Sequence, residues 1–210
     1  LFNLRRMLMN KSFIIKIIVL CLVTIKVSAI EKVILFGDSL MAGYGLPNEQ
    51  HLSVVLQNSL EVEGHNIEIV NGSVSGSTSA GGLNIAEWTL SENNIDLMIL
   101  CLGANDMLRG INPKETKNNL EEIIKIAKNK NIKVVIAGMI APTSYGYSYK
   151  KSFDKIFSDL SKKYKLQLIP FLLEGVAQKP EFNLSDGMHP NDQGTIIIGN
   201  TLKKAILENL

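Results

Sequence analysis

Short apolar runs recur along the chain from residue 32 onward, and each is rich in β-branched side chains. They cover Lys32–Phe36, Ile67–Val70, Ile95–Leu102, Ile132–Ala137 and Leu166–Ile169. Each run is shorter than a typical helix and almost continuously apolar, which indicates a strand buried on both faces of its sheet. The pattern therefore predicts a sheet with one strand for each run.

The segments between these runs have apolar residues spaced as on one face of a helix. Leu52, Val55, Leu56 and Leu60 share such a face, and Gly64 is placed to end that helix in a left-handed conformation. Further helices are expected to begin after the capping residues Asn112 and Asn191, the last one running to about Glu208, and another is expected over 153–164. Tyr145, Tyr147 and Tyr149 are expected in the loop before 153.

Alternation of strands and helices is typical of parallel sheets with right-handed crossovers and helices on both faces. We expect an α/β fold, a three-layer α/β/α sandwich with a five-stranded parallel sheet in the flavodoxin-like order 2-1-3-4-5. In such sheets, ligands bind beyond the carboxyl ends of the strands, where the strand order reverses. Functional residues are therefore expected in the loops that follow the strands.

The N-terminal segment differs in kind from the rest of the chain. Basic residues precede an apolar stretch over residues 13–25, and small residues follow it at Val27 and Ala29. This pattern predicts a secretory signal peptide over residues 1–29, a mature domain over 30–210 and a periplasmic location. A membrane anchor is the alternative, but the uninterrupted apolar run is shorter than the ~20 residues that a spanning helix needs.

The charge balance changes once this leader is set aside. Five of the 22 basic residues lie in it and none of the 20 acidic residues does, so the mature chain is net negative. That balance argues against a nucleic-acid partner. Cys101 is the single cysteine after the leader, which rules out an internal disulfide there. Without clustered cysteines or histidines, neither a metal nor another cofactor is expected.

Four loops carry residues suited to attack on a carbonyl carbon. Ser39 directly follows the first strand and is the candidate nucleophile. His189 is the strongest base candidate among three histidines, and Asp186 is placed in the same tight loop to orient its ring. The backbone N–H groups of Ser39 and Gly76 and the side-chain amide of Asn105 are the candidate oxyanion donors. Together these positions predict a serine hydrolase that works through an acyl-enzyme.

The same loops resemble the conserved blocks of a known family. GDSL at 37–40, SGST at 75–78, GAND at 103–106 and DGMHP at 186–190 resemble, in order and spacing, the four blocks of the SGNH (GDSL) hydrolase superfamily. From about Lys32 onward, the chain is similar to the bacterial thioesterase I/lysophospholipase L1/arylesterase group. The resemblance implies the same triad and oxyanion donors, and acyl esters, acyl thioesters or lysophospholipids as substrates. Ser77 departs from the aspartate that this group often has after the second-block glycine.

Apolar residues that follow the third and fourth strands are candidates for an acyl groove. They are Met107, Leu108, Ile111, Ile140 and Pro142. A groove of this kind favours a long acyl group over the acetyl group of a carbohydrate O-acetylesterase, which is the alternative with the same chemistry. A catalytically silent binding protein is a second alternative, and the complete set of catalytic positions argues against it. The expected partner is a small-molecule or lipid acyl substrate, with at most peripheral membrane contact and a monomer favoured.

Overall fold

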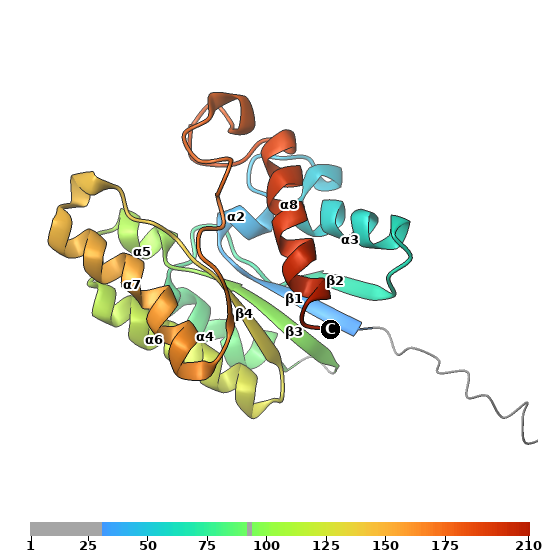
Figure 1. Ribbon diagram of the computed structural model, residues 1–210, viewed down its shortest axis with the longest axis horizontal. Helices are drawn as coiled ribbons and strands as arrows, with labels where there is room; N and C mark the ends of the chain where they lie inside the picture. Colours follow the sequence, from blue (N-terminus) through green and yellow to red (C-terminus); the bar gives the residue numbers. More distant parts are fainter. Residues whose placement is uncertain (1–30, 92–93) are drawn as a thin grey trace, which may run out of the picture.

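The computed structural model describes residues 31–91 and 94–210, which build one parallel sheet with helices on both faces (Figure 1). Its strands are β1 (Glu31–Gly37), β2 (Ile67–Asn71), β3 (Ile95–Cys101), β4 (Lys133–Ala137) and β5 (Gln167–Ile169). They lie in the order β2-β1-β3-β4-β5, and each neighbouring pair is parallel. The predicted strand order is confirmed, and each predicted strand end lies within one residue of the observed end.

The inner strands are buried on both faces, as their continuous apolar sequences predict. In β1 all residues from Val33 to Gly37 are buried, and β3 is buried throughout except at Asp96. Asp96 is tied into the sheet because its carboxylate accepts a hydrogen bond from the Lys32 backbone N–H at 2.8 Å. β2, at the edge of the sheet, is less buried. The core therefore lies along β1, β3 and β4.

The helices form a layer on each side of the sheet. They are α2 (Ser39–Ala42), α3 (Leu52–Val62), α4 (Ser79–Thr89), α5 (Ala104–Leu108), α6 (Pro113–Asn129), α7 (Tyr147–Tyr164) and α8 (Asp192–Leu207). α3 packs against α8 on one face, while α4, α6 and α7 cover the other (Figure 1). The predicted three-layer α/β/α arrangement is confirmed.

The helix ends follow the capping signals in the sequence. α3 ends where Gly64 turns left-handed at φ 80°, and the next N–H, of His65, donates to the Leu60 carbonyl at 3.0 Å. The Asn112 side chain accepts a hydrogen bond from the Lys114 N–H at the start of α6. Asn191 caps α8 in the same way, through the N–H of Gly194. These caps fix where the loops at the carboxyl edge begin and end.

The start of α7 differs from the prediction. Tyr147 and Tyr149, expected in a loop, belong to this helix, and its N-cap is Gly146, which has no capping side chain. Tyr149 stacks on Phe153 within the helix, and its hydroxyl donates to the Ile111 carbonyl at 2.9 Å. These contacts extend the helix past the point where the apolar periodicity begins.

The loops that follow β1, β2 and β3 all open at the carboxyl edge of the sheet. β1 and β3 are neighbours, and the chain leaves β1 toward β2 on one side and leaves β3 toward β4 on the other. The rule for parallel sheets places a ligand crevice at this reversal. No helix in the described ranges is both long and apolar enough to cross a membrane. The predicted signal peptide lies outside the described residues and stays a prediction.

Candidate active site

The nucleophile loop, Gly37–Ala42, joins β1 directly to α2. A Cβ at Gly37 would lie 2.7 Å from the Cys101 carbonyl oxygen, so β1 and β3 leave room only for glycine here. Asp38 caps α2, since its side chain accepts the Leu40 N–H at 3.1 Å. Ser39 is thus the first residue of a short helix rooted on a buried strand, and its side chain reaches the surface of the site.

The acid–base loop, Leu184–Pro190, leads into α8. It is closed by the Leu184 N–H, which donates to the His189 carbonyl at 2.7 Å, and by the Gly187 N–H, which donates to the Leu184 carbonyl at 2.9 Å. One Asp186 oxygen accepts the backbone N–H groups of Met188 at 2.9 Å and His189 at 3.0 Å. Asp186 and His189 are therefore held together by the turn itself.

The two loops bring the three predicted triad residues into one hydrogen-bonded line. His189 Nε2 lies 2.9 Å from Ser39 Oγ, and His189 Nδ1 lies 2.7 Å from Asp186 Oδ2. The backbone N–H of His189, followed by that of Met188, lowers the pKa of Asp186 to about 2. An ionised Asp186 keeps a proton on Nδ1 and leaves Nε2 free to accept one from the serine hydroxyl.

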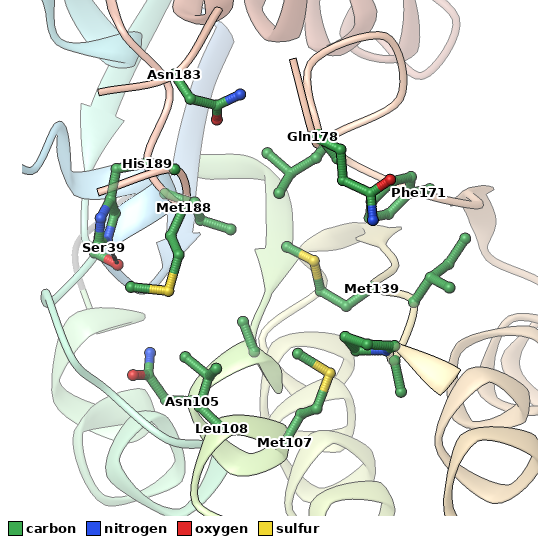
Figure 2. A pocket seen from close by; sticks show the side chains of 18 of the residues that line it. Ser39, Asn105, Met107, Leu108, Met139, Phe171, Gln178, Asn183, Met188 and His189 are labelled. Carbon is green, nitrogen blue, oxygen red and sulfur yellow. Dashed lines mark hydrogen bonds between the residues drawn. The ribbon is translucent and has the colours of Figure 1, made fainter. Parts of the chain in front are cut away.

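The three residues predicted to supply the oxyanion donors, Ser39, Gly76 and Asn105, all line one cleft. Gly76 stands third in a turn closed by the Ser77 N–H on the Val74 carbonyl, and its φ of 78° is one that glycine adopts readily. Among the described residues, neither the Ser39 nor the Gly76 N–H donates to a protein acceptor. Figure 2 shows Ser39 beside His189, with Asn105 across the cleft from them.

Asp38 supports the site from below. It is fully buried, and its second oxygen accepts a hydrogen bond from the Asn105 side-chain amide at 3.2 Å. Burial raises the pKa of Asp38 to about 6, against the opposing effect of its backbone and Asn105 hydrogen bonds. One Asn105 N–H is thereby fixed on Asp38, which leaves the other to face a ligand.

A second buried carboxylate organises the helices behind the site. Asp106 accepts hydrogen bonds from the backbone N–H and the hydroxyl of Ser79 and from the Thr116 hydroxyl at 3.0 Å. It joins α4, α5 and α6, and its hydrogen-bond partners do not include a triad residue. The described residues contain no group of three or more histidine, cysteine or carboxylate side chains arranged to hold a metal.

A cleft of about 890 Å³ runs past Ser39, Gly76, Asn105 and His189. Of the residues predicted for the acyl groove, Met107, Leu108, Ile140 and Pro142 line it. Figure 2 shows the cleft continuing from Ser39 toward Met139, Phe171 and Gln178. The cleft is also lined by residues of the coil after β5, to which the sequence analysis assigns no role: Phe171, Leu173, Ala177 and Gln178. Their place after a parallel strand is the signal that could have found them.

Ile111 is the exception in the predicted groove, because it does not line the cleft. α5 ends at Leu108, and Gly110 then turns left-handed at φ 65°. The Ile111 N–H donates back to the Asp106 carbonyl, while its own carbonyl accepts the Tyr149 hydroxyl. The turn at Gly110 thus carries Ile111 toward α7 and out of the groove.

Comparison with known proteins identifies relatives of this chain in sequence and in structure. The model of the GDSL-like lipase/acylhydrolase family matches residues 35–195. An arylesterase of Vibrio mimicus is 36% identical over 182 residues, which cover 87% of this chain and 91% of that protein. The thioesterase 1/protease 1/lysophospholipase L1 of Escherichia coli K12 is 30% identical over 187 residues, covering 89% and 88%. The crystal structure of TesA superposes with a TM-score of 0.81 at 32% identity, covering 86% of this chain and all of that one.

Proposed function

The chain belongs to the GDSL-like lipase/acylhydrolase family and is a serine hydrolase of ester or thioester bonds, and we propose that Ser39, His189 and Asp186 perform its chemistry. The observation that carries this assignment is the hydrogen-bonded line from Asp186 through His189 to Ser39, at 2.7 and 2.9 Å. A nucleophile, a base and a group that orients the base are thereby in contact before any substrate binds.

The first half-reaction joins the acyl group to the enzyme. Ser39 Oγ attacks the acyl carbon while His189 Nε2 takes the hydroxyl proton, and the oxygen of the carbonyl becomes negatively charged. The Ser39 and Gly76 N–H groups and the Asn105 amide stabilise that charge. His189 then returns the proton to the departing alcohol or thiol. In the second half-reaction, a water molecule activated by His189 releases the carboxylic acid and restores Ser39.

The shape of the cleft supports a substrate with an extended acyl chain. Beyond the triad, its walls carry the apolar side chains of Leu108, Met139, Ile140 and Phe171. Each methylene buried against such a wall contributes about 0.8 kcal/mol, so a chain longer by three or four carbons gains more than tenfold in binding. An acetyl group would leave most of this wall unused, which favours medium- or long-chain acyl esters and thioesters over acetylated carbohydrate.

Labelling of the nucleophile tests the assignment of the triad. A fluorophosphonate probe should attach to Ser39 of the purified protein, and mass spectrometry should locate the adduct there. The Ser39→Ala variant should take up no probe and lose roughly 10⁶-fold in kcat. Ser75 lines the same cleft and provides the matched control, since Ser75→Ala should label like the unmodified protein. An adduct at any other serine would contradict the triad.

A chain-length series tests the groove. Leu108 and Ile140 are both partly exposed, so Leu108→Asp and Ile140→Asp can place a charge on the groove wall without disturbing the core. Activity on long acyl esters should fall about tenfold relative to acetyl esters, because a charge beside a methylene chain removes its favourable burial. Val62→Asp changes an exposed residue of α3 outside the cleft and should leave the ratio unchanged. An unchanged ratio in both groove variants would instead favour the acetylesterase.

A further inference from the structure

An aromatic ring lies against the catalytic histidine without belonging to the triad or the oxyanion hole. The rings of Tyr44 and His189 have centroids 4.4 Å apart and an angle of 38° between their planes. Tyr44 lines the cleft but remains 52% exposed. A half-exposed tyrosine contributes little to the hydrophobic core, so its placement against His189 needs another explanation.

The backbone on both sides of Tyr44 is held in one conformation. Gly43 and Gly45 are both left-handed, at φ 85° and 76°. A Cβ on Gly43 would lie 2.4 Å from the His51 ring, and a Cβ on Gly45 would lie 2.7 Å from a methyl group of Leu184. His51 is fixed in turn, because its Nε2 lies 3.0 Å from the Leu46 carbonyl oxygen. The Tyr44 ring is thus presented from a tightly packed segment.

This segment touches the acid–base loop in two places. The Tyr44 ring meets the His189 ring, and Gly45 meets Leu184. Leu184 is bonded to His189 itself, since its N–H donates to the His189 carbonyl at 2.7 Å. The chain that leaves Ser39 through α2 therefore contacts the ring of the base directly and also contacts Leu184, the residue that is hydrogen-bonded to the backbone of the base.

The triad contacts leave one direction of His189 movement weakly restrained. Its hydrogen bonds to Ser39 and Asp186 run through the two ring nitrogens, whose N–H and lone pair point outward in the plane of an imidazole ring. Such bonds oppose sliding within the plane, but they oppose tilting out of it much less, because hydrogen bonds tolerate a broad range of angles at carboxylate and hydroxyl oxygens. A group packed on the face of the ring opposes the tilt.

We propose that Tyr44 is a positioning residue for the base: its ring keeps the His189 imidazole in the plane that joins Ser39 Oγ to Asp186. The electron-rich face of the tyrosine also suits the positive charge that His189 acquires when it takes the serine proton. The inference rests on the proposed role of His189 as the base. Tyr44, which lies in the segment after the nucleophile helix α2, would then support the base.

Kinetic variants at Tyr44 test the proposal. Tyr44→Leu should lower kcat by about 10- to 100-fold, since a small displacement of a catalytic group costs this much, and should leave KM unchanged. The loss should be equal on acetyl and long-chain esters, because it concerns the base and not the acyl groove. Tyr44→Phe, which keeps the ring, should restore kcat to within about twofold of the unmodified protein. Tyr147→Leu, which removes an exposed tyrosine outside the cleft, is the matched control.

Proton NMR gives a readout that a general loss of folding would not mimic. The Nδ1 proton shared between His189 and Asp186 should give a downfield resonance that persists in Tyr44→Phe and broadens in Tyr44→Leu, while the thermal unfolding temperatures of the two variants agree. A Tyr44→Leu enzyme with unchanged kcat, or with a change in KM alone, would overturn the proposal. So would a loss confined to long-chain esters, which would make Tyr44 a groove residue. If the Tyr44→Leu variant does not fold, Tyr44→Met can replace it in these measurements, because methionine also lacks the aromatic ring.

The underlying proposal is tested separately with His189→Ala. If that variant keeps its activity, His189 is not the base and the proposed function fails. If it is inactive and Tyr44→Leu is not impaired, the function stands and only the role of Tyr44 fails.

Discussion

In the nucleophile loop, Asp38 lies fully buried beneath Ser39, whereas in the acid–base loop Asp186 keeps 34% of its side chain exposed. The two aspartates have environments that shift their pKa values in opposite directions. Burial raises the pKa of Asp38 to about 6, while backbone N–H groups lower the pKa of Asp186 to about 2. Asp38 has one backbone donor and one side-chain amide, whereas Asp186 has two backbone donors and the histidine ring.

The difference shows what each loop is built to do. Asp186 must stay ionised while His189 gains and loses a proton, and a turn that aims N–H groups at one of its oxygens ensures this. Asp38 instead lies where solvent cannot stabilise its charge. Its hydrogen bonds hold the Leu40 backbone and the Asn105 side chain in place. Position next to the nucleophile therefore does not identify the catalytic carboxylate, but the donors around it do.

The strongest test of this contrast is Asp186→Asn. The amide keeps the shape of the loop but lets His189 adopt the wrong tautomer, and we expect kcat to fall roughly 10⁴-fold. Steady-state kinetics on an aryl ester would measure the loss. Asp192→Asn alters an exposed acidic residue at the start of α8 and should retain full activity. A loss of less than tenfold in Asp186→Asn would mean that Asp186 does not orient the base.

Much of this site could be predicted from the sequence because its key residues lie in short loops at strand ends. Asp186 and His189 share one turn, so their contact depends on local geometry alone. Tyr44 and His189 come from distant segments that only tertiary packing brings together. The spacing of apolar residues along the sequence does not predict such a contact. Ile111, predicted for the acyl groove, lies outside the cleft because the turn at Gly110 sets its direction. Phe171, Leu173, Ala177 and Gln178 line the cleft from irregular chain, where neither helical nor strand spacing applies.

The oxyanion side of the comparison is tested by Asn105→Ala. Removal of one donor should lower kcat by roughly 10²–10³, with little change in KM, because the bond matters mainly once charge develops on the carbonyl oxygen. Asn112→Ala removes an asparagine that caps α6 away from the cleft, so it should cost about 1 kcal/mol of stability and leave kcat intact. A higher KM with unchanged kcat would identify Asn105 as a substrate-binding residue instead.

The pH dependence of folding tests whether Asp38 is as poorly solvated as its burial indicates. Its pKa rises from the ordinary 3.8 to about 6 on folding, so between these values the native protein binds a proton that the unfolded chain has released. Stability should therefore fall as the pH rises through this window, by about 3 kcal/mol for this group. Asp38→Asn has no carboxyl group to titrate at this position, so the stability of this variant should not show the fall.

Urea unfolding at pH 4 and pH 7.5 measures the effect in both proteins, and Asp186→Asn supplies the control. The pKa of Asp186 is lowered to about 2, so its contribution is present above its ordinary 3.8 and is lost only as the pH falls toward 2. Asp186→Asn should accordingly keep the wild-type change in stability between pH 4 and 7.5. An Asp38→Asn protein with that same change would mean that Asp38 is ionised without penalty, and the contrast between the two loops would then lie in their hydrogen bonds alone.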